Sequence, residues 1–274
     1  MPDVCILTDS TVQFTRPSFP GRERVYIIPF DLQIAPKDEN GSSFREPKSP
    51  ARLLPPSAND FLRYYTHLSQ KYDSILVLTL SSLLSQAMEN ALLARSQFTN
   101  HCTVEVIDSQ TVGIGLGMLI QAAAGAVSQG LLPAEIERRV RVAIPHIYIL
   151  FCIPELMCLA NAGHMNRSQA IVGEIMSMLP IFTLEDGRLV PTEKVRTPRH
   201  LFEAFQDFMA EFEHPTHIAL VHGSNHNALR IRPLRQYMEE LFPHTPFSEH
   251  SIQPHMTALF GPQSIGLFVS EIPE

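Results

Sequence analysis

Apolar runs and amphipathic stretches alternate along the first half of the chain. Four apolar runs are typical of strands, and they span residues 3–8, 24–34 (interrupted at Pro29), 74–79 and 103–107. Apolar side chains recur at helical spacing over residues 60–71, 84–99 and 112–129. Asn59 is the expected N-cap of the first of these helices. Strands that alternate with helices predict a parallel sheet with right-handed crossovers over residues 1–150.

The pattern changes in the second half. Glu185-Asp186-Gly187 is a hairpin turn signal between apolar segments at 181–184 and 188–194. Further strands are predicted at 147–153, 217–222 and 265–269, and helices at 166–178, 197–213 and 227–242. The expected fold class is therefore α/β, with an N-terminal parallel-sheet domain at 1–150 and a C-terminal α+β domain at 151–274.

Hydroxyl and carboxylate side chains follow three of the predicted strands. Thr8-Asp9-Ser10, the serine-rich stretch 81–85 and Asp108-Ser109 each come directly after an apolar run. Open parallel sheets bind ligands at the carboxyl ends of their strands. The three turns therefore predict one polar spot at the edge of an apolar core.

Composition removes several classes of function. The chain has 21 Lys+Arg against 28 Asp+Glu, a net charge of −7, which is unfavourable for binding nucleic acid. Its most apolar long stretch, residues 113–127, is shorter than the roughly 20 residues that span a bilayer, so no transmembrane segment is expected. The four cysteines form no Cys-x-x-Cys pair, which indicates reduced cysteines and a cytoplasmic protein. His222 and His226 lack a third ligand at a suitable spacing, so no metal is expected.

Four segments carry a family resemblance. They read ILTDST at 6–11, SSLLSQA at 81–87, VEVIDSQTVGIGLGMLIQAAAGAVSQG at 104–130 and GPQSIGLFVS at 261–270. Their order and spacing resemble the DegV family, which has a two-domain EDD-type fold and is known for bacterial proteins that hold one long-chain fatty acid. The resemblance implies a mainly antiparallel sheet in the second domain and a ligand cleft between the domains. It also implies a carrier that does no chemistry, has no cofactor besides the bound lipid, and presents the carboxyl group to a separate fatty acid kinase.

The resemblance also implies which residues contact the ligand. Ser85 occupies the position of the ligand serine, at a helix N-terminus that favours an anion, and Ser82 lies beside it. Thr8 and Ser10 match the first family signature. For Ser82 the alternative role is helix capping, and for Thr8 and Ser10 it is a turn or cap at a strand end. The segment 171–179 either lines an acyl tunnel or belongs to the core.

Three positions depart from the family pattern near the headgroup. Leu53 stands where the family has Thr, His164 where it has Arg, and Leu259 where it has His. These three residues and Gly261 are expected at the ligand site. Burying a carboxylate without partners costs several kcal/mol or more. Three interpretations stay open. His164 supplies the cation, or the headgroup lies at another depth near His255 or Asn166, or the ligand is neutral or differently charged.

Two other functions remain as alternatives. One is a phosphoryl- or acyl-transfer enzyme related to dihydroxyacetone-kinase-type domains, in which His164 would activate Ser85 as a nucleophile. The other is a diverged scaffold without a ligand. The expected function is binding of a long-chain fatty acid or a related acyl lipid between the domains.

Overall fold

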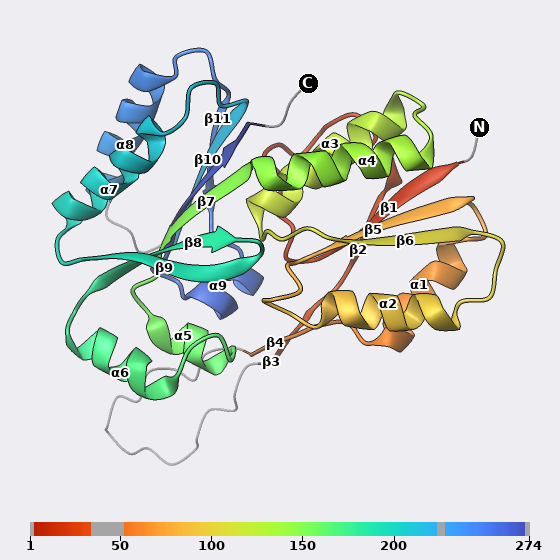
Figure 1. Ribbon diagram of the computed structural model, residues 1–274, viewed down its shortest axis with the longest axis horizontal. Helices are drawn as coiled ribbons and strands as arrows, with labels where there is room; N and C mark the ends of the chain where they lie inside the picture. The colour runs from red at the N-terminus through yellow and green to blue at the C-terminus, as the bar shows by residue number, and fades with distance from the viewer. Residues whose placement is uncertain (1–2, 34–51, 224–227, 272–274) are drawn as a thin grey trace.

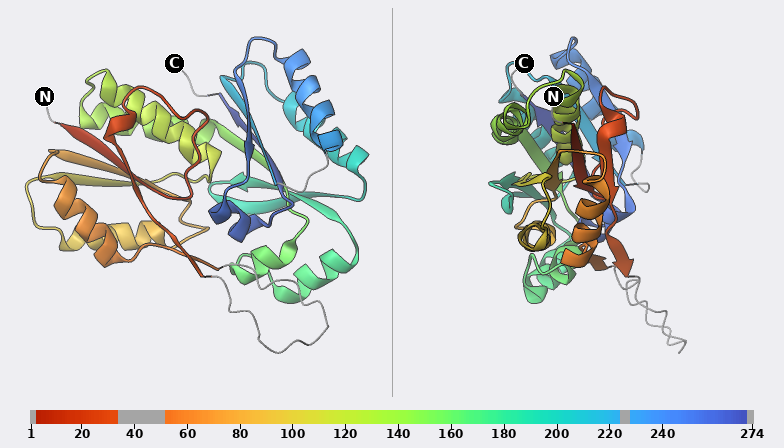
Figure 2. Two further views of the ribbon diagram at one scale, coloured as in Figure 1. Left: turned by 180° about the vertical axis from the view of Figure 1, so that it is seen from behind. Right: turned by 90° about the vertical axis from the view of Figure 1, so that its right-hand side faces the viewer.

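The computed structural model describes residues 3–33, 52–223 and 228–271 (Figure 1). They form two sheets that lie side by side (Figures 1 and 2). The sequence predicts a loop rich in Pro, Ser and charged residues over 35–58. Residues 35–51 of it lie outside the described residues, and residues 52–54 form a short strand instead.

The first sheet has four strands, all parallel, in the order β2-β1-β5-β6. Its strands are β1 (Val4–Asp9), β2 (Val25–Ile28), β5 (Ser74–Thr79) and β6 (Thr103–Asp108). Helices α1 (Ala58–Leu68) and α2 (Ala87–Gln97) pack on one face, and α3 (Ile114–Ser128) and α4 (Pro133–Ala143) on the other. The strands are buried on both faces, which is why they read as continuous apolar runs in the sequence.

The second sheet has six strands in the order β11-β10-β12-β7-β8-β9. Its strands are β7 (Ile147–Cys152), β8 (Leu179–Glu185), β9 (Arg188–Val195), β10 (His217–His222), β11 (Phe247–Ser251) and β12 (Ile265–Ser270). Every neighbouring pair is antiparallel except β10 and β11. Helices α7 (Pro198–Ala210) and α8 (Ala228–Leu241) cover one face, and α5 (Leu156–Asn161), α6 (Arg167–Ile175) and α9 (Pro254–Phe260) lie on the other (Figure 1). The predicted fold class is therefore confirmed, including the mainly antiparallel second sheet.

Short elements complete the described fold. A two-stranded antiparallel ribbon pairs β3 (Asp31–Gln33) with β4 (Arg52–Leu54). Two single 3-10 turns, Arg22–Arg24 and Ile144–His146, lead into β2 and β7.

Several predicted boundaries were wrong. Ser57, not Asn59, caps α1, in a capping box where Ser57 N donates to Asp60 at 2.9 Å. Helix α2 begins three residues later than predicted, because the backbone turns sharply over residues 81–86. The sequence pattern also missed α5, α9 and β11, which are too short for a periodic signal.

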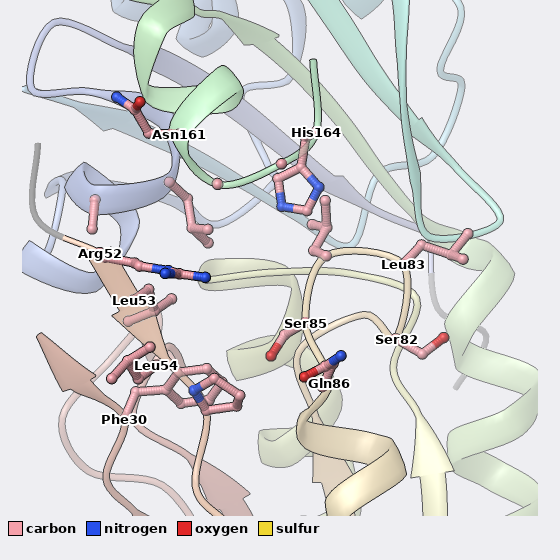
Figure 3. Close-up of a pocket in the computed structure, with 16 residues that line it drawn as sticks. Phe30, Arg52, Leu53, Leu54, Ser82, Leu83, Ser85, Gln86, Asn161 and His164 are labelled. Atoms are coloured by element: carbon pink, nitrogen blue, oxygen red, sulfur yellow. The ribbon is translucent and has the colours of Figure 1, made fainter. Parts of the chain in front are cut away.

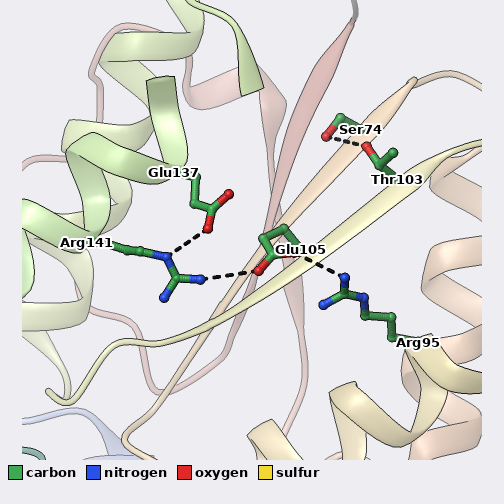
Figure 4. A network of polar contacts seen from close by, with 6 residues as sticks. All are labelled: Ser74, Arg95, Thr103, Glu105, Glu137 and Arg141. Atoms are coloured by element: carbon green, nitrogen blue, oxygen red, sulfur yellow. Dashed lines mark hydrogen bonds and ion pairs between the residues drawn. The ribbon is translucent and has the colours of Figure 1, made fainter. Parts of the chain in front are cut away.

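A network of ion pairs links the outer strand β6 to the helices on either side of it (Figure 4). Glu105 on β6 pairs with Arg95 of α2 at 3.3 Å and with Arg141 of α4 at 3.2 Å. Arg141 also pairs with Glu137 at 2.8 Å. All four side chains are partly exposed, so each pair contributes about 1 kcal/mol or less.

The two halves share one apolar cluster at their junction. It combines Leu84 and Ile114 of the first half with Phe151, Phe260 and Phe268 of the second. Helix α3 crosses the junction and contacts both sheets (Figure 1). A methyl group on Gly117 of this helix would lie 2.0 Å from the carbonyl oxygen of Gln13, so the small residue allows the close backbone approach. The shared cluster lies next to the carboxyl ends of the parallel strands.

Candidate ligand-binding site

Asp9 joins the ends of strands β1 and β5. Its carboxylate accepts hydrogen bonds from Leu80 N at 2.7 Å and from Thr11 N at 2.9 Å. Burial raises the pKa of this fully buried carboxyl, and the hydrogen bonds from Thr11 and Leu80 oppose that rise. Asp9, which belongs to the first family signature, therefore holds the start of the loop that follows β5.

Asp108, at the end of β6, holds the next part of that loop. It accepts hydrogen bonds from Ser82 N and Gln110 N, both at 3.1 Å, and a short one from the Ser82 hydroxyl. Asp108 therefore orders the backbone of its own turn and of the loop after β5. The Ser82 hydroxyl is thereby turned to Asp108, and it does not cap α2.

The second half holds the same loop from the other side. The Ser81 hydroxyl is buried and donates to the carbonyl oxygen of Gly187, at the turn of the β8–β9 hairpin, at 2.7 Å. The turn at residues 185–187 thus connects β8 to β9 and also contacts the loop that follows β5.

Ser85 is the serine of this loop whose hydroxyl lies at the start of helix α2. Its Oγ accepts a hydrogen bond from Ala87 N, the first residue of α2, at 3.2 Å. A hydroxyl that accepts one bond keeps its own proton for another partner. Ser85 can therefore cap the helix and donate to a ligand at once.

A cavity of about 470 Å³ lies beside Ser85 (Figure 3). Its walls come from five segments, namely Phe30, residues 52–55, residues 82–86, residues 161–164 and residues 258–259. The structure thus brings together Ser82, Ser85, Leu53, His164 and Leu259, five of the eight predicted site residues.

The cavity is polar at its mouth and apolar at its floor. Ser82, Gln86 and Asn161 are exposed at the rim, whereas Leu84 and Leu259 are buried and belong to the cluster shared by the two halves. Such a site suits a molecule with a polar head and an apolar body.

His164 points into this cavity from the turn between α5 and α6 (Figure 3). Burial lowers its pKa, and a hydrogen bond with the Leu84 backbone opposes that shift. A bond that favours the protonated ring is one in which the ring donates, so the Leu84 carbonyl accepts. The other ring nitrogen, Nε2, is buried and has no hydrogen-bond partner among the described residues. His164 therefore does not activate the Ser85 hydroxyl in this conformation.

Three predicted site residues do not line the cavity. Thr8 is buried within β1. Ser10 Oγ accepts from Phe30 N at 2.8 Å and lies 3.3 Å from His255 Nε2. Gly261 has a φ of +86° and packs against Glu155, which a side chain at that position would strike. Ser10 and Gly261 shape turns, which is the alternative role expected for Ser10, whereas Thr8 Oγ1 has no hydrogen-bond partner among the described residues.

The alternative headgroup positions are also outside the cavity. Asn166 caps α6 by accepting from Ser168 N at 2.8 Å, and His255 lies against Ser10. Neither side chain lines the cavity beside Ser85.

The predicted site residues did not include eleven of the sixteen residues that line the cavity, among them Phe30, Arg52, Gln86 and Asn161. Arg52 directly precedes Leu53, a position already singled out as a departure from the family pattern. Its positive charge was the available signal, because the neighbouring residue was expected at the headgroup.

A second cavity, of about 520 Å³, lies between α6 and the β8–β9 hairpin. Its lining is mostly apolar, and includes Leu156, Met165, Val172, Met176 and Phe182. Part of the segment 171–179, expected to line either a tunnel or the core, thus faces a cavity. Its exposed side includes Ile175, which is 76% exposed.

The part of the chain that the structure describes contains neither a candidate metal site nor a membrane-spanning helix. No group of three or more His, Cys, Asp or Glu side chains there could hold a metal ion. No helix among those residues is long and apolar enough to cross a bilayer.

Comparison with known proteins identifies the family. A DegV domain-containing protein of Staphylococcus aureus (strain MRSA252) is 26% identical over 274 residues, covering 96% of this chain and 97% of that protein. The fatty acid binding DegV family protein from Streptococcus agalactiae has a TM-score of 0.84 at 17% identity, covering 98% of this chain and 99% of that one. The Streptococcus pneumoniae Fatty Acid Kinase (Fak) B3 protein loaded with linoleic acid has a TM-score of 0.81 at 17% identity, with the same coverage.

The family model described as "Uncharacterised protein, DegV family" matches residues 3–271, nearly the whole chain. The sequence match and the shared fold agree with the motifs at the strand ends. This chain therefore belongs to the DegV family.

Proposed function

We propose that this protein binds a long-chain fatty acid or a related acyl lipid. The observation that carries the proposal is the cavity beside Ser85, with its polar mouth and a floor that belongs to the shared apolar cluster. The relatives whose names state a ligand support it, since they are described as fatty acid binding or as loaded with linoleic acid.

The headgroup would lie beside Ser85 and His164, with Leu53 and Leu259 as apolar walls. Ser85 has a proton to donate, and His164 Nε2 is a buried polar atom without a partner among the described residues. A ligand oxygen beside Ser85 would accept the Ser85 proton, and one that reached His164 Nε2 would give this nitrogen a partner. Ser82, Ser10 and Gly261 would act indirectly, by fixing the loops around the cavity, and Thr8 as part of the buried strand β1.

The acyl chain would run into the second half of the molecule. The apolar cavity between α6 and the β8–β9 hairpin offers space for it. Burying about fifteen methylenes contributes roughly 12 kcal/mol before association costs, and those costs remove about 4–15 kcal/mol. Tail burial therefore offsets most of the association cost, and the headgroup contacts set the selectivity.

We further infer a carrier role in the cytoplasm, with the ligand between two domains that divide near residue 150. Presentation of the carboxyl group to a separate fatty acid kinase is consistent with the polar rim of the cavity and with the name of the pneumococcal relative. An acyl-transfer enzyme is less well supported, because His164 does not engage Ser85. The four buried cysteines, none of them in a disulfide, suit a reducing compartment.

Lipid extraction tests this proposal directly. Purified protein is extracted with organic solvent before and after incubation with a fatty-acid mixture, and released lipids are counted by mass spectrometry. We expect about one fatty acid per chain. A stoichiometric neutral lipid would change the ligand class, and an empty extract after incubation would contradict lipid binding and favour the enzyme or scaffold.

A further inference from the structure

We propose that Arg52 is the permanently charged residue that binds the headgroup in this protein. This inference rests on the proposed function, since it names the group that would recognise a carboxylate in the cavity beside Ser85.

The β3–β4 ribbon places Arg52 at the cavity. Arg52 pairs with Gln33 in the antiparallel register, and the following residues, Leu53 and Leu54, continue along the same wall. Figure 3 shows the Arg52 side chain extending from β4 into the cavity, across from Ser85 and His164. The ribbon therefore delivers a guanidinium to the mouth while its leucines face the apolar part.

The charge of the lining favours an anion. Among the described residues that line the cavity, Arg52 is the one with a permanent charge, and no carboxylate faces it. No hydrogen bond or ion pair within the described part of the chain engages its guanidinium. By contrast, Arg63 of α1 and Arg141 of α4 each pair with an acidic neighbour.

The chemistry of the two candidate cations differs. The guanidinium stays protonated at any physiological pH and offers a planar pair of donors that matches a carboxylate. Burial lowers the pKa of His164, so its ring is mainly neutral near pH 7. Arg52 thus compensates for the leucines at positions 53 and 259, which offer no donors.

A competition experiment tests the assignment. Delipidated protein is incubated with equimolar hexadecanoic acid and hexadecan-1-ol, re-isolated, and its bound lipids are counted by mass spectrometry. Wild type is expected to load mainly the acid. Arg52→Met should lower the acid-to-alcohol ratio by roughly tenfold, the size of a partly exposed charged hydrogen bond, with total lipid unchanged. Arg52→Lys should retain most of the ratio.

Arg138→Met is the matched control, because Arg138 is exposed on α4 and does not line the cavity. An unchanged ratio in Arg52→Met, or an equal loss of both lipids, would overturn the role of Arg52 while lipid binding stands. If wild type loads neither lipid, the proposed function fails, and the role of Arg52 fails with it.

Discussion

Two side chains of the cavity differ in how they depend on pH. Arg52 keeps its charge throughout, whereas His164 must take up a proton to become a cation. Its hydrogen bond to the Leu84 carbonyl orients the ring and leaves Nε2 as an acceptor in the neutral form. A carboxylate near Nε2 would therefore bind together with a proton, while a hydroxyl could donate to Nε2 directly.

We predict a pH-dependent contribution from His164. Burial holds its pKa below the usual range, and a bound carboxylate would raise it. His164 thus has a lower pKa in the ligand-free protein and a higher pKa in the complex. Affinity for the carboxylate is therefore greatest at low pH and falls as the pH rises from the first pKa to the second. The total fall is about tenfold for each unit by which the two pKa values differ. The measurement is hexadecanoic acid affinity from about pH 5 to 9, in wild type and in His164→Ala.

The variant should lose this slope and keep the affinity that Arg52 supplies. Hexadecan-1-ol is the control ligand, because its uncharged hydroxyl cannot raise the pKa of His164 as a carboxylate would. A slope that is the same in wild type and His164→Ala would show that the ring does not sense the headgroup.

At the scale of elements, the β8–β9 hairpin connects the second half to the loop that carries Ser85. Gly187 has a φ of +80°, and a methyl group there would lie 2.4 Å from the Ser81 hydroxyl oxygen. The hairpin turn therefore requires glycine at position 187 for two reasons: the positive φ and the close contact with Ser81.

We predict that Gly187→Ala destabilises the fold more than Gly163→Ala does. Gly163 has a similar φ of +85°, but nothing lies within 4 Å of a methyl group there. Both variants carry the backbone strain of about 1 kcal/mol. Gly187→Ala also disrupts the Ser81 hydrogen bond, for about 1 kcal/mol more. The free energy of unfolding from urea titration measures the difference, and equal losses would mean that the hairpin contact contributes nothing.

For the whole molecule, the ligand would complete the core at the junction of the two halves. A ligand that binds only the folded state adds about 2.7 kcal/mol to the free energy of unfolding at one hundred times its Kd. For a chain of this size, that corresponds to a rise in Tm of roughly 5–10 °C.

We therefore expect hexadecanoic acid to raise the Tm of delipidated protein by this amount in calorimetry. Butanoic acid, which has the same headgroup and too short a chain to fill the interior, should leave the Tm unchanged. A shift of equal size with both acids would place the binding energy in the headgroup rather than in the tail.

The local pattern was sufficient to predict the long elements. β5 was predicted at its observed bounds, because a buried parallel strand is an uninterrupted apolar run with a turn at each end. The parallel sheet was predicted from the alternation of strands and helices along the chain. The position of Ser85 at a helix start was predicted from the family motifs. α5 and α9 were missed because they span only six and seven residues, less than two helical turns each.

What the sequence determined by itself is the class of fold, the family and the serine at the start of α2, since these depend on neighbours in the chain. Only the tertiary structure decided which side chains share the cavity. Arg52 and His164 are separated by more than a hundred residues, and no periodicity relates them. Ser82 and Ser85 are neighbours of the same type, yet Asp108 engages one hydroxyl and leaves the other at the cavity. That choice depends on packing between strands, which becomes visible only when the chain is folded.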